Sequence, residues 1–122
     1  METSSLVIYH SDPRKAQALA VSLSKHFEPV KLVRKYEEVS PAILRLHAEV
    51  LVLDLETSQA DAVRRLHREF PSLCIVATHR LADDGVWTEA MTQGASDVCE
   101  PRNEQVVESV MRERRNFAAA AA

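Results

Sequence analysis

The chain has 122 residues, of which 46% are hydrophobic, 27% charged and only 5% aromatic. These values are typical of one globular domain with a core of Leu, Val, Ile and Ala, and they exclude a fibrous or disordered chain. Fifteen basic against eighteen acidic residues leave a formal net charge of −3. This balance argues against a domain held mainly to the phosphates of nucleic acid.

Glycine and cysteine counts exclude several classes of site. The only glycines are Gly85 and Gly94, too few for a dinucleotide fingerprint and wrongly placed for a P-loop. Cys74 and Cys99 lie far apart in apolar runs, so we expect buried, reduced thiols and no Cys-x-x-Cys site. No apolar run approaches the roughly 20 residues that span a bilayer, and no basic segment precedes an apolar one at the start. We therefore expect a cytoplasmic protein without a membrane segment.

The first half of the chain predicts two strands and two helices. Residues 6–9 are a continuous apolar strand, and Asp12-Pro13 follows as an N-cap with proline in the first helical turn. Apolar residues at helical spacing run from there to Phe27. Residues 30–33 form a charged edge strand, and Ser40-Pro41 opens a short second helix.

The second half continues the alternation. Residues 50–54 are an unbroken apolar strand that must be covered on both faces, and an amphipathic helix follows from Ala62 to Pro71. Residues 73–78 form the fourth strand, and a helix capped by Asp83-Asp84 ends at Gly94. Residues 97–99 are a brief fifth strand before a last helix that Asn103 is expected to cap. Its arginines Arg112, Arg114 and Arg115 suit the negative end of that helix.

Strands that alternate with helices predict a three-layer α/β/α sandwich around a parallel sheet of five strands. We expect one domain, residues 1–117. The alanines 118–122 are expected to be a disordered tail, the start of a linker or a cloning remnant.

Polar side chains follow the predicted strands. In an open parallel sheet, ligands gather beyond the carboxyl ends of the strands. These ends carry His10, Ser11 and Asp12 after the first strand, Asp54 at the end of the third, Thr78-His79 at the fourth and Glu100-Pro101 after the fifth. We expect these groups to meet at one edge of the sheet and to line a pocket.

From Leu6 to about Arg115 the sequence resembles the receiver domain of two-component response regulators. Asp54, after Leu51-Val52-Leu53, stands where that family has its phospho-accepting Asp. Residues 90–97, Ala-Met-Thr-Gln-Gly-Ala-Ser-Asp, resemble the family's Ala-x-x-x-Gly-Ala-x-Asp segment, and Thr78 matches its switch Thr or Ser. The resemblance implies a flavodoxin-like (CheY-like) sheet in the strand order 2-1-3-4-5.

The sequence departs from that family at the residues that carry its chemistry. The two acidic residues that hold Mg²⁺ in receivers are replaced by His10 and Ser11. The family's lysine position is Pro101, or Glu100 with a one-residue gap, and its aromatic switch position is Val98. A carboxylate that attacks a phosphoryl group needs a cation and fixed donors to offset the charge, so phosphotransfer at Asp54 is disfavoured.

The sequence therefore favours a pseudo-receiver that signals by protein-protein interaction, without enzymatic activity and without a cofactor. The resemblance implies a protein partner, an attached effector domain or a homodimer, meeting the face of helix four, strand five and helix five. Candidate contact residues there are Trp87, Val98, Arg112 and Arg115. The alternative is a functional receiver that is phosphorylated on Asp54 with Mg²⁺ in a phosphorelay.

Each candidate also has a simpler interpretation. Asp54 could be a relic or a strand-end carboxylate that accepts backbone hydrogen bonds, and Asp12 suits an N-cap better than a surviving metal ligand. A Zn²⁺ site is conceivable at His10 and His79, with Asp54 and Glu56 close by, but imidazoles at strand ends more often bond their surroundings. Trp87 also has two interpretations, since it suits a contact surface or a helix-packing position equally well.

Overall fold

The computed structural model describes the backbone of residues 4–121 and the side chains of residues 4–117. Strands and helices alternate along the chain as the sequence predicts. In chain order they are β1 (Leu6–Tyr9), α1 (Pro13–Leu23), β2 (Val30–Val33), the 3-10 turn η1 (Tyr36–Glu38), α2 (Val39–Leu46), β3 (Val50–Asp54), α3 (Ala62–Glu69), β4 (Cys74–Thr78), α4 (Asp84–Gln93), β5 (Asp97–Cys99) and α5 (Asn103–Ala121).

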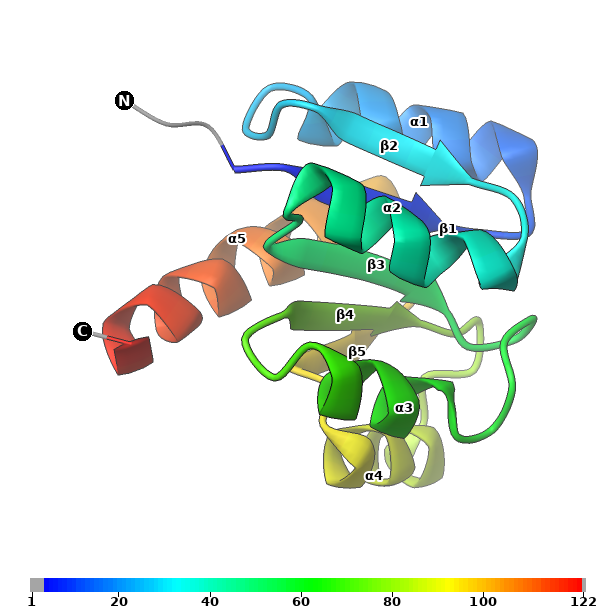
Figure 1. Cartoon of the computed structure of the whole chain (residues 1–122). Helices are drawn as coiled ribbons and strands as arrows, with labels where there is room; N and C mark the ends of the chain where they lie inside the picture. Colours follow the sequence, from blue (N-terminus) through cyan, green and yellow to red (C-terminus); the bar gives the residue numbers. More distant parts are fainter. Residues whose placement is uncertain (1–3, 122) are drawn as a thin grey trace.

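The strands form one parallel five-stranded sheet in the order β2-β1-β3-β4-β5, which confirms the predicted fold class and strand order (Figure 1). Tyr9 pairs with Leu53, and Asp54 pairs with Thr78. The carboxyl ends of β1, β3 and β4 therefore lie level with one another at one edge of the sheet. The pairing register of the strands therefore places the polar residues that follow them at the same edge.

Helices cover both faces of the sheet, with α1 and α5 on one face and α2, α3 and α4 on the other (Figure 1). Alternate residues of each central strand enter the two cores, because side chains along a strand point to opposite faces. Val52 packs with α1 and α5, while Leu51 and Leu53 pack with the other three helices. This double coverage explains why the strands are continuous apolar runs.

Several helix ends follow the predicted caps. The Asp12 carboxylate accepts hydrogen bonds from the N–H groups of Arg14 and Lys15 (2.9 and 3.4 Å), and Asp83 accepts one from Val86 (2.9 Å). Gly94 ends α4 with a φ of 120°. These ends were predictable because each depends on one local residue type.

Other helix ends differ from the prediction. α2 begins at Val39, ahead of Ser40-Pro41, since a proline fits within the first turn of a helix. Asn103 does not act as the expected cap. It is the first residue of α5, and its side-chain amide donates to Ser22 Oγ (2.9 Å) on the neighbouring helix α1.

The last helix continues past the expected end of the domain. α5 includes the backbone of residues 118–121, where a disordered tail was expected, and residue 122 lies outside the described residues. The arginines therefore lie inside the helix and not at its negative end. Arg112 pairs instead with Asp97 (2.7 Å), and Arg114 lies 5.3 Å from the centre of the Phe27 ring. Across residues 4–121, no helix has the length and apolarity needed to cross a membrane.

Candidate functional site

Asp54 ends β3 and is only 1% exposed, yet each of its carboxylate oxygens is hydrogen-bonded. Oδ2 accepts from the Ser11 N–H (3.2 Å), the Ser11 O–H (2.8 Å) and the Thr57 O–H (3.0 Å). Oδ1 accepts from the Glu56 N–H (3.0 Å). We call these four donors, from Ser11, Glu56 and Thr57, the Asp54 cage.

The cage stabilises the charged form of this carboxylate. Burial by itself raises the pKa of Asp54, because desolvation disfavours the anion. The hydrogen bonds from Ser11, Glu56 and Thr57 together outweigh that effect and bring the pKa below its ordinary value. Asp54 is thus an ionised carboxylate whose charge is compensated by neutral donors.

Nδ1 of His10 and both polar groups of Ser11 bond to the protein itself, whereas Nε2 of His10 is buried and has no hydrogen-bond partner among the described residues. Nδ1 of His10 accepts the Asp12 N–H (3.0 Å), and the ring is only 9% exposed. Ser11 donates to Asp54 from both its backbone and its side chain. The Asp12 carboxylate is engaged at the N-terminus of α1. The expected N-cap role of Asp12 is thereby confirmed.

A polar cavity of about 410 Å³ lies over the Asp54 cage. It brings together four of the predicted pocket residues, which are His10, Ser11, Asp12 and Pro101. The sequence analysis did not name Lys15, Thr57 or Arg80 as pocket residues, but all three line this cavity together with Glu56. Lys15 comes from the first turn of α1, and Arg80 from the segment after β4.

The Arg80 guanidinium is held by a carboxylate of the same cavity. The guanidinium Nε donates to Glu56 Oε1 (2.7 Å), and the backbone N–H of Arg80 donates to Glu56 Oε2 (3.3 Å). These hydrogen bonds hold the pKa of Glu56 below its ordinary value. The pair leaves Lys15 as the cavity residue whose ammonium has no carboxylate within ion-pair distance among the described side chains.

Two predicted pocket residues are placed elsewhere. Thr78 is fully buried beside Asp54 in the sheet, and its hydroxyl has no hydrogen-bond partner among the described residues. Glu100 pairs with Arg102 (3.1 Å) and is not part of the cavity lining. Thr78 is thus too deep to touch a molecule in the cavity as it stands, and Glu100 faces a neighbour on its own loop.

The two strand-end histidines do not form a joint site. Nδ1 of His79 accepts the Leu81 N–H (2.9 Å), and His79 lines a different cavity from His10. Within residues 4–121, no group of three or more His, Cys, Asp or Glu side chains is placed to hold a metal ion.

The residues around Asp54 do not fit the magnesium ion that the resemblance implies. Mg²⁺ needs oxygen ligands with free lone pairs in a near-octahedral shell. Oδ2 of Asp54 already accepts three hydrogen bonds, and Nδ1 of His10 is also taken. The cage therefore presents donors at the place where such an ion requires acceptors.

The predicted contact residues differ in accessibility. Trp87 on α4 is 46% exposed, and Arg112 and Arg115 are exposed on α5. Val98 is only 7% exposed, because the middle residue of β5 points into the core below α2, α3 and α4. Its expected place in an interface is corrected to a core position, while the interface role of the other three stays a prediction.

Residues missed by the sequence analysis left weak signals. Thr57 follows Asp54 by three residues, and a carboxylate at a strand end often collects hydrogen bonds from the turn after it. Arg80 gave no signal, because its place over the cavity depends on the path of the segment after β4. The double contact from Ser11 also depends on β1 and β3 being neighbours.

The chain is similar in structure to a response regulator from Thermotoga maritima, with 19% identity, a TM-score of 0.81 and coverage of 92% of this chain and 98% of that chain. It is also similar to the N-terminal signal receiver domain of a two-component system response regulator from Bacteroides fragilis, with 20% identity, a TM-score of 0.81 and coverage of 92% and 97%. A third similar structure is the beryllofluoride-activated NtrC4 receiver domain dimer, with 13% identity, a TM-score of 0.81 and coverage of 93% and 98%.

No protein-family model and no curated protein matches the sequence. At these identities the structural likeness shows the fold alone, which is that of a receiver domain. One fold hosts many functions, so the function must be argued from the site.

Proposed function

We propose that this chain is a receiver-like signalling module that acts by binding a protein partner and has no phosphotransfer activity. The observation that carries the proposal is the Asp54 cage, in which four neutral donors occupy the acceptor oxygens. On this account Asp54 stabilises the loop after β3 and is not a nucleophile. The module is not an enzyme and works in the cytoplasm without a cofactor.

The energetic argument concerns the charge that phosphotransfer would create. An incoming phosphoryl group brings further anionic oxygens, which need a cation and preorganised donors. In this site the donors already stabilise the unreacted carboxylate, which favours the ground state over the transition state. Loss of one electrostatic partner typically costs about 3 kcal/mol of transition-state stabilisation, or roughly a hundredfold in rate.

The binding surface we propose is the face formed by α4, β5 and α5. Trp87 supplies an exposed aromatic ring on this face, and exposed Trp is enriched in protein interfaces. The similar NtrC4 receiver domain is a dimer. A second copy of this chain, or an effector domain attached to it, is therefore the partner that we expect on this face.

The second candidate function is phosphorylation on Asp54 in a two-component phosphorelay. It is favoured by the place of Asp54 at the carboxyl end of β3, and by Lys15 in the cavity lining. An ammonium group in the lining of this cavity offers some of the positive charge that a phosphoryl group needs.

The two candidates differ in their response to a phosphoryl mimic. Amide NMR spectra are recorded for the full chain with Mg²⁺, before and after addition of beryllofluoride, and the same titration is repeated on Asp54→Asn. The binding module predicts spectra that do not change around Asp54 and Thr78. Saturable shifts in the native chain that vanish in Asp54→Asn contradict the proposal and support the phosphorelay.

A further inference from the structure

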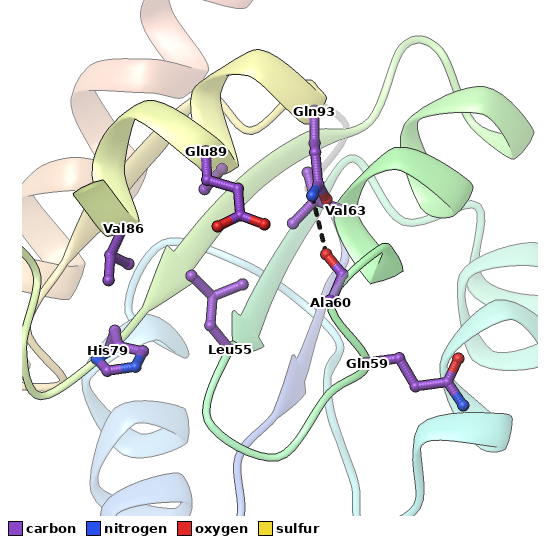
Figure 2. A pocket seen from close by; sticks show the side chains of 9 residues that line it. Leu55, Gln59, Ala60, Val63, His79, Val86, Glu89 and Gln93 are labelled. Atoms are coloured by element: carbon purple, nitrogen blue, oxygen red, sulfur yellow. Dashed lines mark hydrogen bonds between the residues drawn. The ribbon is translucent and has the colours of Figure 1, made fainter. Parts of the chain in front are cut away.

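A second cavity, of about 190 Å³, lies between α3 and α4 and shares no residue with the cavity over Asp54 (Figure 2). Its apolar lining comes from three elements, with Leu55 after β3, Val63 on α3, and Val86 and Ala90 on α4. Ala90 and Val63 are buried in the core, so the inner wall of the cavity is well packed. The cavity offers a small, mainly apolar slot of about 190 Å³.

Hydrogen bonds across the cavity hold its two helices together. The Gln93 side chain is 8% exposed, and its Nε2 donates to the Ala60 carbonyl at 2.8 Å (Figure 2). Its Oε1 accepts the Arg64 N–H (3.3 Å) in the first turn of α3. This amide thus fixes α4 against the start of α3, and the walls of the cavity are set before any ligand arrives.

The cavity carries a single carboxylate at its mouth. Glu89 is exposed, and its carboxylate points across the opening toward Leu55 (Figure 2). No ion pair of Glu89 is present in the part of the chain that the structure describes, and no Lys or Arg side chain lines the cavity. An apolar slot with an anion at its mouth complements a ligand with an apolar stem and a cationic end.

Two large exposed apolar side chains lie close in sequence to residues of this lining. Leu81 is 70% exposed and lies two residues after His79, which lines the cavity. Trp87 is 46% exposed and follows Val86, another lining residue. A free small cation in the slot would leave both side chains in water, whereas a polypeptide bound at the opening is large enough to extend onto them. Anchor side chains that fill pockets, and exposed aromatic residues on the surface, are both typical of protein interfaces.

We propose that this cavity binds an arginine side chain of a partner protein, with its aliphatic stem on Leu55 and Val86 and its guanidinium on Glu89. Arginine suits the site better than lysine, because its planar guanidinium can bind the carboxylate in bidentate fashion. This surface is independent of Asp54, so it does not depend on the loss of phosphotransfer.

The test uses the peptide acetyl-Leu-Arg-Leu-amide and its neutral isostere, in which citrulline replaces arginine. Binding to the full chain is followed by NMR of the Leu55, Val63 and Val86 methyl groups, with the peptide raised to about 10 mM, enough to detect a dissociation constant near 1 mM. We expect saturable shifts with the arginine peptide and at least about fivefold weaker binding of the citrulline peptide.

Variants then assign the binding to the cavity. Glu89→Gln should weaken the arginine peptide about fivefold, whereas Glu104→Gln, an identical charge change at an exposed position of α5, should leave it unchanged. Trp87→Ala should weaken the peptide but not acetyl-arginine-amide. The proposal is overturned by an absence of saturable shifts, by equal binding of the two peptides, or by an unchanged affinity in Glu89→Gln. If acetyl-arginine-amide binds as tightly as the peptide, the site takes a small free cation and the proposed protein surface is wrong.

Discussion

The Ser11 hydroxyl gives direct access to the energetics of the Asp54 cage. Ser11→Ala removes the shortest of the four hydrogen bonds to the carboxylate (2.8 Å) and keeps the backbone N–H bond at 3.2 Å. A hydrogen bond to a charged group contributes about 1.5 to 3 kcal/mol, and Asp54 itself is only 1% exposed, so water replaces the lost donor less well than at a surface carboxylate. We expect the free energy of unfolding at neutral pH to fall by about 2 kcal/mol, measured by urea denaturation.

The effect should depend on pH in a defined direction. The pKa of Asp54 in the folded chain lies below its ordinary value of 3.8, so its contribution to stability is fully present above that value. The contribution is lost as the pH falls through the folded pKa, where the carboxylate becomes protonated. Because Ser11→Ala raises the folded pKa toward the ordinary value, the difference between the native chain and the variant should shrink below about pH 4.

A matched control is available on the surface of α2. The Ser40 hydroxyl donates to Glu69 Oε1 at the same distance, 2.8 Å, but in an exposed setting. Ser40→Ala should change the free energy of unfolding by less than about 0.5 kcal/mol, because water replaces the lost donor. A Ser11→Ala effect as small as this control, or one that stays constant from neutral to acidic pH, would refute the reasoning.

Three further predictions concern other parts of the molecule. Gly94→Ala should lower the free energy of unfolding by about 2 to 4 kcal/mol, because φ is 120° and the new Cβ would lie 2.5 Å from His67 Cγ. Adding His67→Ala should restore part of this loss. If the effects of the two substitutions on the free energy of unfolding simply add, the proposed clash is wrong. Gln93→Ala should lower the free energy of unfolding by about 1 to 2 kcal/mol and speed amide hydrogen exchange in the first turn of α3. Unchanged exchange there would contradict a role of Gln93 in holding α4 against α3. Burial raises the pKa of Cys74 to about 11 and that of Cys99 to about 12. At about pH 8 the thiols of the folded chain should therefore react with iodoacetamide at least about tenfold more slowly than those of the chain unfolded in urea. Equal rates would show that the thiols of the folded chain are accessible.

The fold was predictable because its determinants are local or periodic. Apolar runs such as residues 50–54 indicated strands covered on both faces, and Asp12, Asp83 and Gly94 marked helix ends through their own chemistry. Four of the predicted pocket residues line one cavity, since parallel strand ends share one edge of the sheet; whether they bind anything stays a prediction.

The remaining features depend on contacts between distant segments. Asn103 has the residue type of a cap but bonds to α1, since α5 packs against that helix. The arginine Arg112 faces Asp97 on β5, a partner that helix periodicity alone does not reveal. The cavity beside Glu89 lies where Gln93 on α4 bonds to the segment that leads into α3, and no spacing in the sequence indicates that contact.

The chemistry of Asp54 is most directly tested by intact-mass spectrometry of the full chain after brief exposure to acetyl phosphate and Mg²⁺. Asp54→Asn serves as the matched variant, and hydroxylamine treatment identifies any acyl phosphate. A carboxylate held by four neutral donors, and by no cationic side chain among the described residues, predicts no phosphoryl adduct in either protein. A stoichiometric, hydroxylamine-labile adduct on the native chain that is absent from Asp54→Asn would contradict the account.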